Sequence, residues 1–327
     1  MAFRLKLVPS VTRINFFRGW QFTAAFSILI TIAALASVAV QGFNLGIDFS
    51  GGTSIRAEST EPPDLPGLRA VLEARQLTDV TLTEVFDPNF RADQHVVQIR
   101  ASKGGEEPGL SPDEIGELQR ALQEVDPGIT FTQTDSVSGK VSGELFWTAL
   151  LSLVAASAGI LLYLWMRFEW QFAVGAVLSL VHDAVLVLGV WSFFQLKFDL
   201  TTVAAVLTII GYSVNDTVVI FDRVRENLMK FKQMSFHDLL NLTINETLSR
   251  TVMTSTTTLL ALLALLIWGG DVIRGFVLAM IIGVATGVYS TVYVATIIVL
   301  KLGINRDKPE KKERGGSPHD PYAHVGH

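Results

Sequence analysis

Six long apolar runs constrain the fold of this chain more than any other feature of its sequence. Each is about 18 residues or longer, the length at which an apolar stretch becomes a candidate membrane-spanning helix. Of all residues 49% are hydrophobic and only 17% are charged, whereas about 25% are charged in a typical soluble domain. The runs therefore predict an α-helical polytopic membrane protein with six transmembrane helices. They cover residues 22–40, 145–166, 172–194, 200–221, 251–268 and 275–300.

The distribution of Lys and Arg predicts the side of the membrane that each loop occupies. Basic residues are concentrated at the N-terminus, in the loops after the second and fourth runs, and in the C-terminal tail. The short loops on the opposite side carry only Lys197 and Arg274. Since basic loops remain in the cytoplasm, we expect both termini there and the long segment after the first run outside.

These patterns divide the chain into a membrane-embedded part and one external domain. The first run is longer than the about 7–15 apolar residues of a signal peptide, so we expect an uncleaved anchor. A capping-box-like start and an apolar stripe after the fourth run predict an amphipathic helix on the cytoplasmic surface. The expected parts are a cytoplasmic N-terminus (1–21), a first transmembrane helix (22–41), an external domain (42–143), a five-helix bundle (144–301) with an amphipathic loop at 222–250, and a disordered cytoplasmic tail (302–327).

The external segment has its own alternation of strands and helices. The predicted order is strand 53–58, helix 65–72, strands 80–86 and 95–101, helix 112–125 and a last strand from Ile129. Ser111-Pro112-Asp113-Glu114 has the pattern of a capping box with proline at the first helical position. The order βαββαβ predicts a ferredoxin-like α+β domain.

Ionisable residues inside the apolar runs are few and costly. A charged side chain at the centre of a bilayer costs roughly 2.5–3.5 kcal/mol on insertion scales. Asp216 follows Asn215 in the fourth run, and Asp183 follows His182 midway along the third. A rise of about 1.5 Å per residue places Asp216 in the inner third of the membrane and Asp183 nearer its middle. Both are candidate functional residues.

Arg250 stands at the cytoplasmic edge of the fifth run, at a depth where it could pair with Asp216. Helical spacing places Thr254 and Thr257 or Thr258 on the face of Arg250. Burial disfavours an ionised carboxylate and a nearby arginine favours it, so a helix movement that changed their separation would bind and release a proton. The predicted proton-transport residues are Asp216, Arg250 and Asp183, and the supporting polar residues are Asn215, Thr247, Thr254 and Thr258.

Other interpretations of these residues stay open. Asp216 and Arg250 could form only a structural ion pair, and the hydroxyl run after Arg250 could serve hydrogen bonding between helices. His182 and Asp183 superficially resemble a metal-hydrolase pair, but no second histidine cluster accompanies them in the membrane. The chain has no cysteine and no evident nucleophile–base set. We therefore expect no enzymatic activity, no metal or other cofactor, and no nucleic-acid partner.

A glycine-rich stretch, GIDFSGG at residues 46–52, follows the first run. It lacks the Gly-Lys-Ser/Thr ending of a nucleotide-binding P-loop. Glycine adopts backbone angles that other residues avoid, so we expect a tight connection into the first strand.

Four blocks of sequence resemble the SecD/SecF family of protein-export membrane proteins, on its SecF branch. They are GIDFSGG (46–52), the His182-Asp183 pair, GYSVNDTVVIFDRVREN (211–227) and TINETLSRTVMTSTTTLLALLALLIWGG (243–270). The resemblance extends from the first apolar run to the sixth. It implies a membrane architecture similar to that of resistance–nodulation–division transporters.

The resemblance also implies a function in the bacterial inner membrane. Members of this family work with SecD, which supplies six further spans, and assist the SecYEG channel and the SecA motor. They use the proton motive force to help translocate unfolded preproteins on the outer side. In this family, the aspartate of the GYSVND block and the arginine of the TLSRT block are associated with proton transport. The matching residues here are Asp216 and Arg250. Asp183 matches a family position as well.

Two alternatives belong to other functional classes. A resistance–nodulation–division exporter of small molecules typically carries two six-span halves and two large external domains, whereas this chain has one of each. A scaffold subunit without proton flux is the other alternative, because an ion pair and a proton site look alike in sequence.

Overall fold

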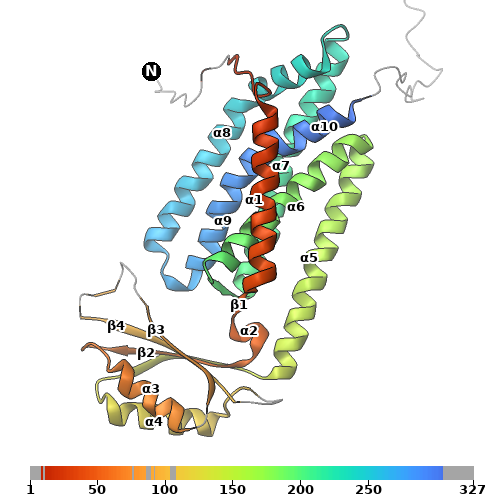
Figure 1. Cartoon of the computed structure of the whole chain (residues 1–327). Helices are drawn as coiled ribbons and strands as arrows, with labels where there is room; N and C mark the ends of the chain where they lie inside the picture. The colour runs from red at the N-terminus through yellow and green to blue at the C-terminus, as the bar shows by residue number, and fades with distance from the viewer. Residues whose placement is uncertain are drawn as a thin grey trace, which may run out of the picture.

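A bundle of long helices with a smaller α+β domain at one end makes up the molecule (Figure 1). The computed structural model describes residues 9, 12–75, 77–85, 90–91, 93–103 and 108–304, so the predicted disordered tail lies outside the described residues from 305 onward. Six helical segments of the described chain are long and apolar enough to cross a membrane, which confirms the predicted fold class. They are α1 (Trp20–Gln41), α5 (Gly139–Arg167), α6 (Trp170–Phe193), α7 (Leu200–Lys230), α8 (Phe236–Trp268) and a sixth formed by α9 (Asp271–Ser290), a π-helix (Thr291–Ala295) and α10 (Thr296–Leu302).

The α+β domain, residues 52–137, has the predicted order βαββαβ. Its strands form an antiparallel four-stranded sheet in the order β3-β4-β2-β5, which is a ferredoxin-like arrangement. Leu68 of α3 and Leu122 of α4 pack with Ile55 and Ile99 of the sheet in one buried core. Both helices lie on the side of the sheet that faces away from the bundle (Figure 1). The elements are β2 (Gly52–Ser59), α3 (Leu65–Ala74), β3 (Thr78–Val85), β4 (His95–Ser102), α4 (Pro112–Val125) and β5 (Thr130–Val137).

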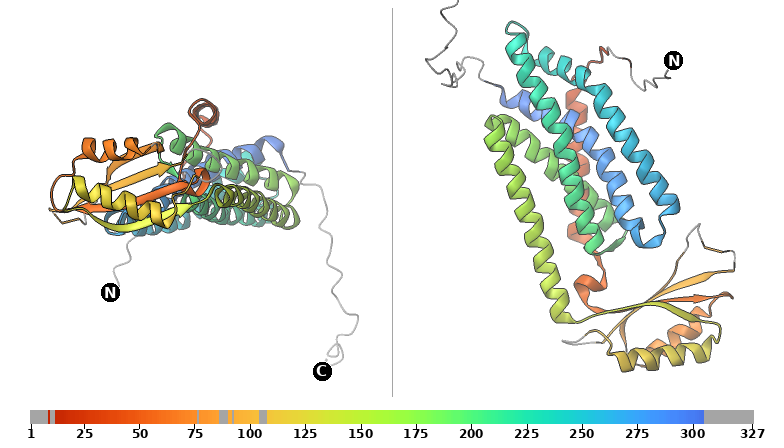
Figure 2. Two further views of the ribbon diagram at one scale, coloured as in Figure 1. Left: turned by 90° about the horizontal axis from the view of Figure 1, so that it is seen from below. Right: turned by 180° about the vertical axis from the view of Figure 1, so that it is seen from behind.

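Short elements that the sequence pattern did not reveal join the domain to the bundle. β1 (Asn44–Leu45) follows α1 and pairs in parallel with β6 (Lys197–Phe198), which precedes α7. The one-turn helix α2 (Ile47–Ser50) lies between β1 and β2 and packs against α5. α5 continues almost directly from β5 along one side of the bundle (Figure 2). It begins at Gly139, inside the range expected for the external domain.

The amphipathic helix expected within 222–250 is present as the first part of α8, which Ser235 caps as the sequence predicts, but it is not a separate element. α7 continues to Lys230 and α8 begins at Phe236, so this region consists of the ends of two long helices. Leu240 of α8 and Phe221 of α7 belong to the same buried core cluster. The apolar stripe that suggested a membrane-surface helix is therefore buried against α7 and its neighbours.

The helices of the bundle differ in how far the rest of the chain covers them. In α6, 56% of the most apolar stretch is buried, against 11% in α1 and 0% in α5. Phe172 and Trp191 of α6 are among the largest fully buried side chains. α1 and α5 instead expose large apolar side chains such as Phe22 and Trp147. α6 is thus the central helix, and α1 and α5 present surfaces suited to lipid or to other transmembrane helices.

Candidate proton-transport site

Asp183 of α6 lies inside the bundle with 0% of its surface exposed. Its Oδ2 atom accepts hydrogen bonds from the hydroxyls of Ser213 on α7 and Ser290 on α9, each 2.7 Å long. Ser290 accepts a further hydrogen bond of 2.9 Å from Ser179 on α6. Hydrogen bonds to a carboxylate are stronger than those between neutral groups. One buried side chain therefore connects α6, α7 and α9.

His182 approaches the other oxygen of Asp183, with 3.3 Å between its Nδ1 and Oδ1 of the carboxylate. The Nε2 atom of His182 is buried and has no hydrogen-bond partner among the described residues. The ring of Tyr289 lies 6.2 Å away between centroids. Within the described part of the chain, no group of three or more His, Cys, Asp or Glu side chains is arranged to hold a metal ion.

Asp216 of α7 is also buried, with 4% of its surface exposed. Arg250, the partner that the sequence predicts, is exposed on α8. Between these two described residues there is no ion pair within 4.0 Å, although Arg250 acts on Asp216 electrostatically from farther away. The rotation of α8 explains the difference, because Thr247 and Thr251 on either side of Arg250 in sequence occupy the buried face. The predicted pair is therefore not a direct contact.

Asp216 nevertheless lies near the residue of α7 that contacts Asp183. Ser213, which contacts Asp183, precedes Asp216 by less than one turn, or about 4.5 Å along the helix axis. Thr217, next to Asp216, shares a hydrogen bond of 3.1 Å with Thr291 in the π-helix. Single π-helical turns occur frequently at functional sites. Asp183 and Asp216 thus belong to one buried polar region between α6, α7 and the sixth span.

The predicted supporting residues have different surroundings. Thr258 of α8 accepts a hydrogen bond of 3.2 Å from the hydroxyl of Tyr212 on α7. Thr247 and Thr254 donate to carbonyls of their own helix, and Asn215 is exposed. Thr258 is therefore the one of the four whose side chain, within the described contacts, links α8 to the helix that carries Asp216.

Buried hydroxyls form a row on α8, and of its members only Thr247 is among the supporting residues predicted from the sequence. Thr251 and Ser255 are 2% and 5% exposed, and neither hydroxyl has a hydrogen-bond partner among the described residues. With Thr247 they recur at every fourth position, which places them on one face of the helix. The spacing of these residues is visible in the sequence. The predicted polar face, however, was the one that carries Arg250, and that face is exposed in the structure. Such unpaired hydroxyls are suited to bind ordered water.

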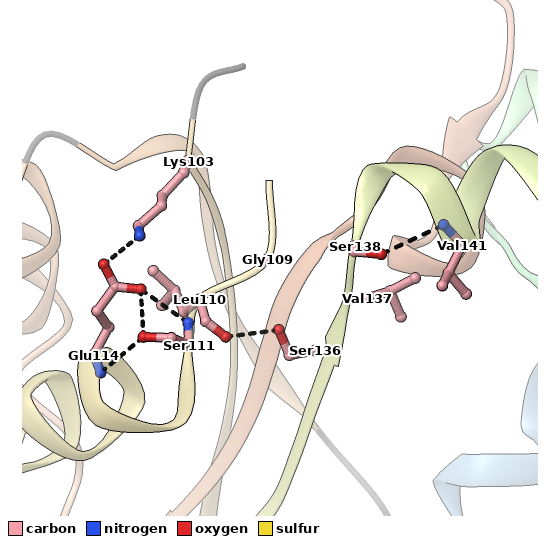
Figure 3. Close-up of a pocket in the computed structure, with 9 residues that line it drawn as sticks. All are labelled: Lys103, Gly109, Leu110, Ser111, Glu114, Ser136, Val137, Ser138 and Val141. Carbon is pink, nitrogen blue, oxygen red and sulfur yellow. Dashed lines mark hydrogen bonds and ion pairs between the residues drawn. The ribbon is translucent and has the colours of Figure 1, made fainter. Parts of the chain in front are cut away.

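A hollow of about 420 Å³ lies at the other end of the molecule, where the α+β domain meets α5 (Figure 3). It is remote in the fold from Asp183 and Asp216, which belong to the bundle. Polar and apolar residues make up its wall, without a set of side chains that resembles a catalytic site. The lining residues are Lys103, Gly109, Leu110, Ser111, Glu114, Ser136, Val137, Ser138 and Val141.

Glu114 beside this hollow completes the predicted capping box of α4. Its carboxylate accepts a hydrogen bond of 2.8 Å from the backbone N–H of Ser111, while the Ser111 hydroxyl accepts one from the Glu114 N–H. Lys103 forms an ion pair with the same carboxylate. The hydrogen bond from Lys103, followed by those from Ser111, lowers the pKa of Glu114 from 4.5 to about 2. This cluster stabilises the start of a helix and shows no feature of a proton path.

Comparison with known proteins identifies a family. The family model described as protein export membrane protein SecD/SecF, C-terminal, matches residues 117–305, and the SecD/SecF GG motif matches residues 36–63. The protein translocase subunit SecF of Rhodobacter capsulatus is 57% identical over 95% of this chain and 95% of its own length. The protein of the same name from Cereibacter sphaeroides is 54% identical over 97% of this chain and 98% of its own length.

Two solved structures of longer chains are similar to this one. SecDF, a translocon-associated membrane protein from a Thermus species, superposes with a TM-score of 0.79 at 35% identity over 90% of this chain. SecDF in a super-membrane-facing form gives 0.66 at 36% identity over 91% of this chain. The present chain spans 39% of each of those chains. At nearly equal identity, the fold therefore matches the first arrangement more closely than the second.

Proposed function

We propose that this chain, which belongs to the SecD/SecF family of protein-export membrane proteins, couples proton movement through its helix bundle to protein export. Its similarity to SecF subunits over nearly its whole length makes it an accessory subunit of the Sec translocase. What we propose beyond this is the energy source. One elementary charge that crosses a potential of 100 mV releases about 2.3 kcal/mol, which a protein with a suitable carboxylate can use.

The environment of Asp216 is the observation that carries the proposal. Asp216 is only 4% exposed, and its carboxylate has neither a hydrogen bond nor an ion pair with any other described residue. An ionised carboxylate without a partner inside the membrane is costly in free energy. Uptake of a proton removes this cost, whereas a carboxylate in an ion pair has less to gain from it. A residue that only locked two helices together would need a direct contact with its partner.

Asp183 and its hydroxyls supply the neighbouring proton acceptor. Ser213 of α7 is three residues from Asp216, and its hydroxyl already donates to Asp183 of α6. A hydroxyl can accept one proton and donate another, so a chain of hydroxyls and ordered water can pass protons between Asp183 and Asp216. Arg250 then acts from the exposed side of α8, and a rotation or shift of that helix changes its influence on Asp216.

A scaffold role without proton flux is the second candidate, and one observation favours it. Asp183 of α6 accepts hydrogen bonds from both α7 and α9, as expected of a residue that fixes helix positions. The same argument does not extend to Asp216, which lacks such partners among the described residues. An exporter of small molecules has less support, because the relatives that are 57% and 54% identical to this chain are translocase subunits.

Family membership implies association with SecD and with the Sec translocase. We propose that a SecD-like part complements this chain, which corresponds to 39% of the SecDF chains. We further propose that the SecYEG channel, the SecA motor and an unfolded preprotein are partners. In the proposed orientation, both termini lie in the cytoplasm of a bacterial cell, the spans cross its inner membrane, and the α+β domain faces outward.

The test is reconstitution of this chain with SecD and the SecYEG channel in vesicles that report internal pH. We expect Asp216→Asn and Arg250→Met to reduce both proton flux and the gradient-driven part of preprotein export. Asp222→Asn is the matched control, because Asp222 is on the same helix but forms a partly exposed ion pair with Arg167. Unchanged export and gradient dependence in both variants would reject the proton role and favour a scaffold.

A further inference from the structure

The glycine-rich stretch 46–52 has no role in the proposed proton path, yet it lies where the α+β domain meets the bundle. It follows β1, whose parallel pairing with β6 brings it beside the start of α7. The backbone N–H of Gly46 donates a hydrogen bond of 2.7 Å to the carbonyl of Phe198. A side chain at this glycine would not fit easily, because its Cβ would lie 3.2 Å from that carbonyl oxygen and from Cβ of Asp199.

Asp48 makes the most specific contact in this stretch. Its Oδ2 atom accepts a hydrogen bond of 3.1 Å from the backbone N–H of Leu200, the first residue of α7. The N–H groups in the first turn of a helix have no partner within the helix, and negative charge there is favourable. The helix's own cap, Asp199, accepts from the N–H of Thr202. Two carboxylates therefore share the start of α7, and Asp48 comes from a distant part of the chain.

The residues between Asp48 and the sheet are tightly packed. Phe49 is buried, and its ring lies 5.7 Å from that of Phe198 and 6.1 Å from that of Phe146 on α5. Gly51 has a φ of 71°, and a Cβ there would lie 2.4 Å from Cγ of Pro108. Gly52 is already the first residue of β2. Displacement of α7 along its axis would therefore pull on the central strand pair of the domain.

We propose that Asp48 is a positioning residue that links α7 to the α+β domain, so that a change in the protonation of Asp216 moves the domain. This inference rests on the proposed proton function. Asp216 lies about 24 Å from Leu200 along α7, which is a single uninterrupted helix. A helix of this kind transmits a displacement from its buried carboxylate to its capped end.

The experiment measures the distance between the two parts in the full chain, reconstituted with SecD. The natural sequence contains no cysteine, so Glu73→Cys on α3 and Met229→Cys at the far end of α7 are the only sites that take spin labels when this chain is labelled before it is combined with SecD. Both positions are exposed. We expect Asp216→Asn to shift the distance distribution when Asp48 is present, and Asp48→Ala to abolish that shift.

Two further variants separate a link from general damage at the helix start. Asp199→Ala removes another side-chain acceptor at the same helix end while the sequence of residues 46–52 and the hydrogen bond from Leu200 to Asp48 stay, and should keep the shift. Asp48→Asn retains an acceptor oxygen and should retain the shift as well.

The inference is overturned if Asp48→Ala keeps the shift, if Asp199→Ala loses it equally, or if Asp216→Asn shifts nothing. Proton flux is measured in the same vesicles. Flux that survives Asp216→Asn rejects the proposed function, whereas lost flux without a shift rejects this inference alone.

Discussion

Ser213 of α7 donates a hydrogen bond of 2.7 Å to the fully buried carboxylate of Asp183 on α6. Ser213 also lies within one turn of Asp216, on the same buried face of α7. This contact brings two carboxylates from different spans into one polar region. It makes Ser213 a residue that can be tested for both stability and proton transfer.

Replacement of Ser213 by Ala should destabilise the bundle, because Asp183 then loses one of its two hydroxyl donors. A hydrogen bond to a charged group contributes about 1.5–3 kcal/mol to the free energy of unfolding. Ser192→Ala is the control, since Ser192 accepts only a neutral hydrogen bond of 3.1 Å from Ser37, worth about 0.5–1.5 kcal/mol. Thermal unfolding of the detergent-solubilised protein measures both. Equal losses in the two variants would mean that the contact with Asp183 contributes no more than an ordinary buried hydrogen bond.

Thr251→Val should leave stability unchanged or increase it slightly, because the buried hydroxyl of Thr251 has no partner among the described residues. Thr247→Val should instead cost about 0.5–1.5 kcal/mol, since the Thr247 hydroxyl donates to two carbonyls of α8. If Thr251→Val were the more damaging of the two, an ordered water would have to bridge that hydroxyl. Denaturant unfolding monitored by tryptophan fluorescence compares them.

Gly189→Ala should weaken the packing of α1 on α6. A Cβ at Gly189 would lie 2.3 Å from Cβ of Ala34, and overpacking of this kind costs about 1–3 kcal/mol. Gly143→Ala on α5 is the control, because a Cβ there meets nothing within 4 Å. It should gain about 0.5–1 kcal/mol from helix propensity. Melting temperatures that fell equally in both variants would contradict the close contact.

Glu114 should make the start of α4 sensitive to acid. The hydrogen bonds from Lys103 and Ser111 lower the pKa of Glu114 from 4.5 to about 2, so the ionised form is the one that the folded state favours. The stabilisation is complete above pH 4.5 and is lost as the pH falls toward 2. Carbon-13 NMR of labelled glutamate should give a midpoint near 2, which Lys103→Met raises. A midpoint unmoved by Lys103→Met would contradict the ion pair.

Much of the fold follows from local patterns. The capping box at Ser111 placed the start of α4 correctly, and alternating strand patterns placed β2 and β4 within a residue or two of their ends. The capping signal at Ser235 also placed the start of α8, but the sequence did not show that this stretch continues into the fifth span, because an apolar stripe on a helix does not say what covers it. α2, β1 and β6 are too short for a periodic signal and exist only because distant segments meet.

Some residues of the candidate site were likewise predictable from the sequence, and others were not. The cost of a charge in an apolar run singled out Asp183 and Asp216 directly from the sequence, and both are buried in the bundle. Asp216 and Arg250, both described residues, do not form the expected contact. The rotation of α8 turns Arg250 outward, and the sequence does not show that rotation. Ser213 and Ser290 carried no signal, since serine is an ordinary residue in a transmembrane helix.

The sequence by itself determined the six spans, the order of elements in the α+β domain and the presence of two membrane-embedded carboxylates. These depend on composition and on periods of two or 3.6 residues, which are local properties. Only the tertiary structure decided which polar groups meet. Asp183 contacts Ser213 and Ser290 across sequence separations of 30 and 107 residues. Because successive residues are about 100° apart around a helix, a small rotation of one helix exchanges its buried side chains for exposed ones, and packing alone sets that rotation.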